Sequence, residues 1–210
     1  MYLSKLNLNL AHSWYAWIVR NPWQTHRTIM RGFPQDYQGD KDQRILFRLE
    51  TNVDPTREIL VQSLHEPDWS WLYDHQVISQ YQVKTWEPTF NVGDQCLFRL
   101  LINPVGNHSV GPMGGESVKR KPVDDNRMED WLARRQANLG FEVVRCQTRV
   151  SSASARKGGD NWIILGLNYD GLLRVTDPAT FEMSLRKGLG KSRGFGYGLL
   201  SVSAPLLPVF

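Results

Sequence analysis

The sequence is poor in cysteine and has no long apolar run. Its 210 residues include only Cys96 and Cys146, which form no CxxC pair, so neither a disulfide framework nor a dithiol redox motif is expected. We expect both thiols to be buried and unreactive in a reducing, cytoplasmic setting. The absence of zinc-ligand spacing among histidines and cysteines predicts no metal and no other cofactor. No run of 18 apolar residues occurs, so no membrane partner is expected.

Acidic residues are absent from both ends of the chain. Residues 1–34 and residues 183–210 each carry four Lys or Arg and no Asp or Glu, whereas residues 35–100 carry six cations and eleven acids. Residues 119–157 are again basic, with ten cations and five acids. Such segregated charge is typical of a chain that binds a polyanion. The alternative interpretation is ordinary solvated surface charge.

Glycine is concentrated near the C-terminal end, where five glycines fall within residues 188–198. Glycine lets backbone N–H groups approach a ligand closely, and interleaved cations favour a phosphate ligand. The spacing excludes a Walker A loop, and the glycines precede a strand, which disfavours a Rossmann motif. The structural alternative is a tight turn that packs the last helix on a sheet. The candidate phosphate-binding residues are Gly188, Gly190, Lys191, Ser192, Arg193, Gly194 and Gly196.

Periodicity predicts an α+β chain with two similar halves. Apolar alternation predicts strands, and Asn21-Pro22 and Asp177-Pro178 are typical helix starts. The result is two tandem ferredoxin-like (RRM-like) domains with antiparallel sheets, residues 1–88 and residues 89–210. The expected strands are 2–9, 45–50, 58–63, 77–84, 95–103, 141–150, 162–175 and 199–203; the expected helices are 21–33, 67–72, 125–139 and 178–187, with a loop at 104–122 and a hairpin tip at 151–159.

Seven motifs occur in the same order in a known family. They are Met1–Leu6, Asn21–Arg27, Leu46–Glu50, Leu60–Ser63, Glu66–Trp69, Phe98–Pro104 and Gly188–Ser201. Through them the chain resembles, essentially from end to end, the CasE family of CRISPR-associated proteins, the repeat-cleaving endoribonucleases of type I-E systems. The resemblance implies two ferredoxin-like units, in agreement with the pattern above.

The resemblance also implies a function. A CasE-like protein binds the stem-loop of each CRISPR repeat in precursor RNA and cuts once, at the 3′ base of the stem. It needs no metal and produces a 2′,3′-cyclic phosphate and a 5′-hydroxyl. It then stays on the mature guide RNA as a subunit of the Cascade complex, so the expected partners are this RNA and other Cascade subunits.

Three basic or titratable side chains of the segment 21–31 are candidates for the chemistry. His26 matches the catalytic histidine of the family, and a histidine suits proton transfer because its pKa lies near neutrality. General acid and general base both remain open for it. Arg27 and Arg31 lie four residues apart near His26 and are candidates to stabilise a phosphorane. A surface histidine and a solvated arginine pair are the alternatives.

Trp23 departs from the family pattern, which often has tyrosine at this place. Indole offers only an N–H donor, so the tyrosine is dispensable, is replaced by another group, or its loss makes cleavage slow. Stacking on a base is one replacement role, and core packing is an equal alternative. This departure motivates a second hypothesis, a non-catalytic RNA-hairpin-binding subunit of the same complex. A phosphate-ligand enzyme is a third hypothesis, which lacks a second catalytic constellation.

Further cations are candidates for RNA contacts. Arg156 and Lys157, in the expected hairpin tip, are placed to contact a groove of the stem, where shape and phosphates are recognised more than bases. Five others are candidates to follow the RNA backbone: Lys119, Arg120, Lys121, Arg134 and Arg135. The tryptophans, including Trp69, Trp71 and Trp131, are expected mostly in the core.

Overall fold

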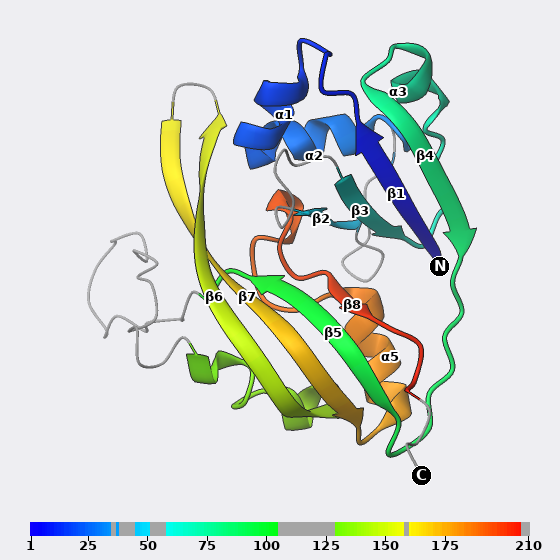
Figure 1. Cartoon of the computed structure of the whole chain (residues 1–210), viewed down its shortest axis with the longest axis vertical. Coiled ribbons are helices and arrows are strands. Elements are labelled where there is room, and N and C mark those ends of the chain that lie inside the picture. Colours follow the sequence, from blue (N-terminus) through cyan, green and yellow to red (C-terminus); the bar gives the residue numbers. More distant parts are fainter. Residues whose placement is uncertain (35–36, 38–44, 51–57, 105–128, 158–159, 207–210) are drawn as a thin grey trace.

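Two four-stranded antiparallel sheets, each formed by one half of the chain, make up the molecule (Figure 1). The computed structural model describes residues 1–34, 37, 45–50, 58–104, 129–157 and 160–206. No helix within these ranges is long and apolar enough to cross a membrane. The α+β class and the tandem ferredoxin-like arrangement predicted from periodicity are confirmed.

The first sheet has the strand order β2-β3-β1-β4. It arises from a strand–helix–strand–strand–helix–strand sequence, in which all neighbouring strands are antiparallel. This order is the ferredoxin-like topology. The elements are β1 (Tyr2–Leu8), α1 (Tyr15–Arg20), α2 (Pro22–Met30), β2 (Leu46–Glu50), β3 (Glu58–Ser63), α3 (Ser70–Asp74) and β4 (Ile78–Thr85).

The second sheet repeats this order as β6-β7-β5-β8. Its elements are β5 (Gln95–Ile102), η1 (Glu129–Trp131), η2 (Gln136–Leu139), β6 (Phe141–Lys157), β7 (Asp160–Val175), α5 (Pro178–Lys187), η3 (Arg193–Phe195) and β8 (Leu200–Val202). The predicted helix 125–139 is wrong in type, since its described part forms two 3₁₀ helices. Trp131 and Leu132 are buried there, while residues 133–135 are exposed. Two adjacent side chains thus pack on the sheet from a single turn, and the segment lacks the apolar face that would hold a longer α-helix against it.

Each sheet buries one face beneath its own helices. Ile18, Ile29, Phe47 and Trp69 belong to the core of the first unit, and the Trp69 indole donates to Ser4 Oγ at 3.0 Å. Phe98, Phe141 and Phe181 belong to the core of the second. The predicted loop at 104–122 lies almost entirely outside the described residues.

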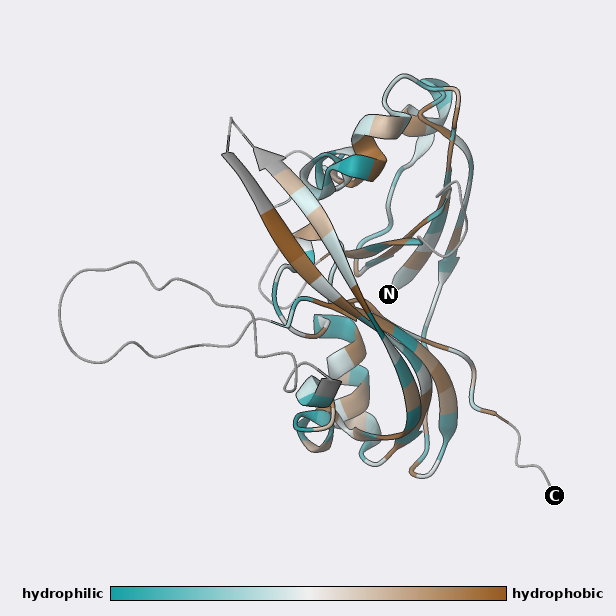
Figure 2. Cartoon of the chain, turned by 60° about the vertical axis from the view of Figure 1, so that its left-hand side comes forward, coloured by the Kyte–Doolittle hydropathy of each residue, from teal (hydrophilic) through white to brown (hydrophobic). Residues whose placement is uncertain are grey.

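Strands β6 and β7 continue far beyond the second sheet as a twisted arm (Figures 1 and 2). Residues 151–157, expected as a hairpin tip, are paired strand residues, from Ser151 opposite Gly166 to Lys157 opposite Asp160. The expectation failed because serine and alanine are weak strand formers, whereas here the facing strand satisfies their backbone groups. The arm reaches the first unit, where β6 contacts α1 and α2.

The two cysteines lie in different environments. Cys96 is fully buried in β5, and burial raises the pKa of its thiol to about 11. Cys146 is exposed on β6, which corrects the expectation that both thiols are buried. The reason is its place on an edge strand of the second sheet, where one face and one edge remain open.

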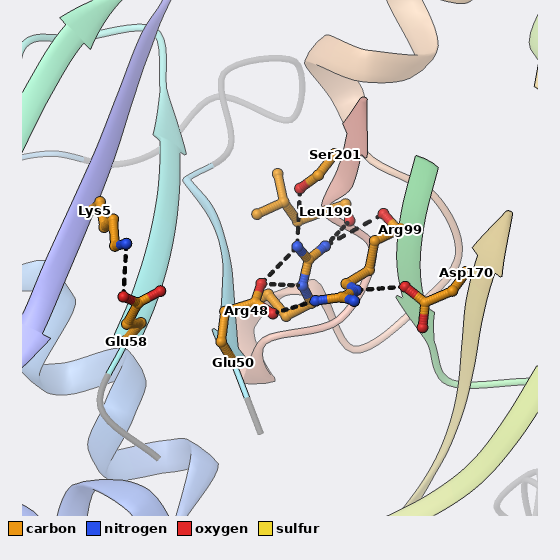
Figure 3. Close-up of polar contacts among 8 residues, drawn as sticks. All are labelled: Lys5, Arg48, Glu50, Glu58, Arg99, Asp170, Leu199 and Ser201. Carbon is orange, nitrogen blue, oxygen red and sulfur yellow. Dashed lines mark hydrogen bonds and ion pairs between the residues drawn. The ribbon is translucent and has the colours of Figure 1, made fainter. Parts of the chain in front are cut away.

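A buried guanidinium joins the two sheets (Figure 3). Arg48 on β2 is 3% exposed and donates from Nε to Glu50 at 2.8 Å. Its other nitrogens donate to second-unit groups: the Arg99 carbonyl at 3.3 Å, the Leu199 carbonyl at 3.1 Å and Ser201 Oγ at 3.0 Å. One side chain of the first sheet thereby satisfies three acceptors of the second.

The charges continue from Arg48 into the second sheet. Glu50 also pairs with Arg99 on β5 at 2.9 Å, and Arg99 in turn pairs with Asp170 on β7. A separate hydrogen bond, from Gln62 Nε2 to the Leu185 carbonyl at 2.7 Å, ties β3 to α5. The relative position of the two units is therefore set by directed polar contacts.

Replacement of Arg48 by alanine is expected to lower the free energy of unfolding by about 3 kcal/mol, because the buried Leu199 carbonyl loses its donor and Glu50 loses one of its two arginine partners. Urea denaturation followed by circular dichroism measures this loss. Lys5→Ala is the control, since the Lys5–Glu58 pair is exposed and contributes about 0–1 kcal/mol. Equal, small effects of the two variants would contradict the assigned role of Arg48.

Candidate active site

The candidate histidine lies on α2, whose start follows directly from the sequence. The Asn21 side chain accepts from the Trp23 amide at 3.1 Å, and Pro22 occupies the first turn, as the predicted cap requires. Thr25 fastens the helix to α1 through a hydrogen bond from Oγ1 to the Ile18 carbonyl at 2.7 Å. The inner side of the helix buries Thr25, Thr28 and Ile29. His26 is therefore half-buried, and Arg27 is exposed.

Aromatic rings flank the His26 imidazole. The Trp23 ring lies 5.7 Å from it between centroids, and the Phe47 ring of β2 lies 6.3 Å away, nearly parallel. Burial among these groups lowers the pKa of His26 below its ordinary value, because a charged imidazolium is poorly solvated there. The free protein consequently favours a neutral imidazole, which can accept a proton.

The glycine-rich segment reaches this site from the second unit. The ring of Phe195 in η3 lies 6.3 Å from Trp23, and η3 contacts both α2 and β2. Two segments that the sequence singled out, about 170 residues apart, are thus adjacent in space. Trp23, whose role was left open, stands between His26 and this loop.

Several conformations in the glycine-rich segment require glycine. Gly198 has φ +86°, and a Cβ there would lie 2.4 Å from the Leu189 carbonyl oxygen; Gly188 has φ +68° and would meet Leu46 at 2.7 Å. Both positions serve close packing within the protein. Gly194 differs, because nothing lies within 4 Å of its Cβ position and it is exposed.

Polar side chains of the segment also make contacts within the protein. Arg193 donates from Nε to the Gly190 carbonyl at 3.0 Å and from Nη1 to the Lys187 carbonyl at 2.7 Å, which satisfies the end of α5. Ser192 Oγ accepts from Asn103 Nδ2 at 2.7 Å. The segment is therefore held in one conformation by the residues predicted to bind phosphate.

A cavity of about 780 Å³ runs along α2 on the other side of His26. Arg31 lies in it with its guanidinium carbon 4.2 Å above the Trp71 ring and 5.4 Å from the Trp14 ring. None of the described residues lining the cavity is acidic. They are Trp14, Trp17, Trp23, His26, Arg27, Thr28, Met30, Arg31, Phe33, Pro34, Tyr37 and Trp71.

The remaining predicted RNA contacts are dispersed. Arg134 and Arg135 are exposed beside η2, which packs on α5 at the end of the molecule away from α2 (Figure 1); the Arg135 guanidinium stacks on Trp131 at 4.4 Å. Arg156 and Lys157 lie at the far end of β6. The predicted contacts Lys119, Arg120 and Lys121 lie outside the described residues.

Two groups of candidate side chains were missed by sequence reasoning. Arg145 and Arg149 are exposed on β6, within the strand predicted at 141–150. Their four-residue spacing, which places both on one face of a strand, is the sequence signal that would have identified them. Trp71 was assigned to the core, yet it is only partly buried and stacks on Arg31. The three-residue spacing of Trp14 and Trp17, just before α2, is the sequence signal that would have marked an aromatic surface.

A matched pair of glycine variants tests the packing role of the loop. Gly198→Ala is expected to destabilise the protein by about 1–3 kcal/mol, since φ is positive and the carbonyl must move. Gly194→Ala is expected to change stability by about 0.5 kcal/mol or less. Thermal unfolding of both variants measures the difference, and a Gly198→Ala protein as stable as wild type would refute the assignment.

Comparisons with known proteins agree with this geometry. Residues 1–204 match the family described as CRISPR associated protein. The chain is 29% identical to the CRISPR-associated endoribonuclease Cse3 of Thermus thermophilus, over 97% of this chain and 100% of that protein. It is 26% identical to the Cascade subunit CasE of Escherichia coli, over 98% of this chain and 100% of that protein.

Solved structures show the same relationship. The chain superposes on Cse3 bound to a 19-nucleotide RNA with a TM-score of 0.83 at 29% identity, covering 97% of this chain and 100% of the other. It superposes on Thermus thermophilus Cse3 bound to an RNA representing a pre-cleavage complex with a TM-score of 0.82 at 28% identity, covering 96% and 98% of the two chains. From the match over nearly its whole length, this chain belongs to the CasE (Cse3) family of CRISPR-associated proteins.

Proposed function

We propose that this protein is an endoribonuclease that binds the CRISPR repeat stem-loop in precursor RNA and cleaves it at the 3′ base of the stem. It then stays on the guide RNA as a Cascade subunit. The observation that carries the proposal is the position of His26 on α2, between the glycine-rich segment, which reaches it through Phe195 and Trp23, and a cavity lined by Arg27 and Arg31. The relatives named Cse3 and CasE support the substrate and the complex.

The proposed reaction is attack of a 2′-hydroxyl on the adjacent phosphorus. His26 accepts the 2′-proton as general base, a role that its lowered pKa favours. Arg27 and Arg31 stabilise the negative charge of the phosphorane. The P–O5′ bond then breaks, the 5′-oxygen takes a proton from water, and the products are a 2′,3′-cyclic phosphate and a 5′-hydroxyl.

The donor set favours chemistry without a metal. The described residues contain no group of three or more His, Cys, Asp or Glu placed to hold a metal ion, and the lining of the cavity supplies arginines and one imidazole. Arginine can stabilise anionic oxygens directly. We therefore propose that cleavage proceeds in EDTA.

Division of labour between the two halves follows from these assignments. We propose a catalytic domain at residues 1–88 and an RNA-holding domain at residues 89–210. The second contributes the arm of β6 and β7, with Arg145, Arg149, Arg156 and Lys157 along one strand. Its glycine-rich segment, with Lys191 and the exposed Gly194, lies next to the cut.

A second candidate function is a non-catalytic subunit that binds the hairpin. The contact between Trp23 and His26 favours it, since indole cannot accept a proton where the family pattern often has a phenol. In that case the protein binds repeat RNA tightly and leaves it intact. Trp23→Tyr would then be expected to restore cleavage.

Cleavage of a repeat hairpin in EDTA tests both candidates. Wild type is expected to cut once, and His26→Ala to cut about 10²–10⁴-fold more slowly with unchanged hairpin affinity. His65→Ala, which alters an exposed histidine outside the cavity, is the matched control. A 2′-deoxy substitution at the cut should abolish the reaction. Cleavage that survives the 2′-deoxy substitution would refute the proposed attack.

The pH dependence separates general base from general acid. If His26 is the base, kcat/KM rises with pH and levels off above a pKa lower than about 6.5, the ordinary value for histidine, because only the neutral imidazole accepts the proton. Initial rates between pH 5 and pH 8.5 measure this profile. A kcat/KM that falls over the same range would assign His26 as the acid.

A further inference from the structure

The aromatic cavity beside His26 extends well beyond the reacting groups. Three indoles form its far part. Trp14 directly precedes α1, Trp17 lies on α1 and Trp71 lies on α3. Trp17 is 44% exposed, and its ring lies 6.0 Å from that of Trp14. A volume of about 780 Å³ is within the range of sites that hold a small organic ligand.

Arg31 gives this cavity a positive charge whose orientation is fixed by stacking. The Trp14 and Trp71 rings support one face of the Arg31 guanidinium, while Arg31 as a whole is exposed. A stacked guanidinium keeps its N–H edge free to bind an anion. Arg27 lines the same cavity, and the described lining residues include no carboxylate to compete. Flat indoles next to two cations are complementary to a nucleotide, which has a π-face and a phosphate.

The cavity lies on the side of α2 away from the arm. A separate cavity of about 300 Å³ separates α1 and α2 from the arm, and it is lined by Pro22, Thr25, Ser152 and Phe195 but not by His26. Trp23 contacts both Phe195 and His26, so it marks the boundary between the two sides. An RNA held by the arm and the glycine-rich segment must pass His26 to enter the aromatic cavity.

We propose that this aromatic cavity binds the first unpaired nucleotide on the 3′ side of the scissile phosphate. Its base stacks on Trp17, and its 5′-phosphate, which is the scissile phosphate, pairs with Arg31 as in the proposed reaction. The inference rests on the proposed function, because the polarity of the strand follows from a cut at the 3′ base of a stem held on the arm side. Stacking recognises any base, so the site adds affinity and alignment with little sequence preference.

Affinity for two hairpin RNAs tests the proposal. One RNA ends at the cut, and the other carries two unpaired nucleotides beyond it with a 2′-deoxy substitution that blocks cleavage. Wild type is expected to bind the longer RNA about tenfold more tightly, the effect of one stacked base. Trp17→Ala should lose this advantage without a change in affinity for the shorter RNA. Tyr81→Ala, on an exposed ring of β4, is the matched control and should keep it.

A fluorescent base gives a second readout. 2-Aminopurine placed directly after the cut should be quenched by wild type and by Trp17→Phe, which retains a ring, and should stay bright with Trp17→Ala. Unchanged quenching in Trp17→Ala, or equal affinities of wild type for the two RNAs, overturns the proposal while cleavage by wild type still supports the proposed function. A wild type that neither binds nor cuts either hairpin overturns the proposed function itself.

Discussion

The position of the candidate active site depends on one buried guanidinium. Arg48 makes its hydrogen bonds to groups of both sheets, and its neighbour Phe47 stacks on His26. Alternation along β2 sends these two side chains to opposite faces. Because a buried charge costs desolvation, such a pair is weak evidence of net stability. The effect of Arg48 is to orient the two units. Strand β2 contacts His26 through Phe47 and, through Arg48, holds the Leu199 carbonyl directly after the glycine-rich segment.

The glycine-rich segment forms a rigid turn because other parts of the protein pack closely around it. Glycine permits a close approach equally well to a ligand and to another part of the chain, so the sequence alone supported both interpretations. Gly198 and Gly188 approach backbone and side chains of the protein, and Arg193 closes the turn on α5. Within this rigid turn, the exposed Gly194 and the basic Lys191 are the groups that we propose for contact with RNA. A loop that is already fixed can present its backbone groups to RNA with little further loss of conformational entropy on binding.

Sequence patterns predicted the strands of both sheets and the two helices capped by Asn21 and Asp177, because alternation and capping are local properties. They missed α1, and they ended the β6–β7 arm too early, because its serines and alanines become strand only when the facing strand pairs with them. For the site, the segment of His26 and the glycine-rich segment could be named. Their contact could not, since it depends on how the two sheets pack. The stacking of Arg31 on Trp71 is equally non-local.

Apolar and charged groups meet on one face of α2. Trp23, His26 and Arg27 lie three and four residues apart, so they share that face and line one cavity. Trp23 and the Phe47 ring of β2 give His26 apolar surroundings, which favour the neutral imidazole. Arg27 and Arg31 are exposed, so their positive charges remain solvated at the edge of the same cavity. Trp23 fits this arrangement. Its indole supplies the low-polarity wall that favours a neutral histidine, and it needs no proton of its own to do so.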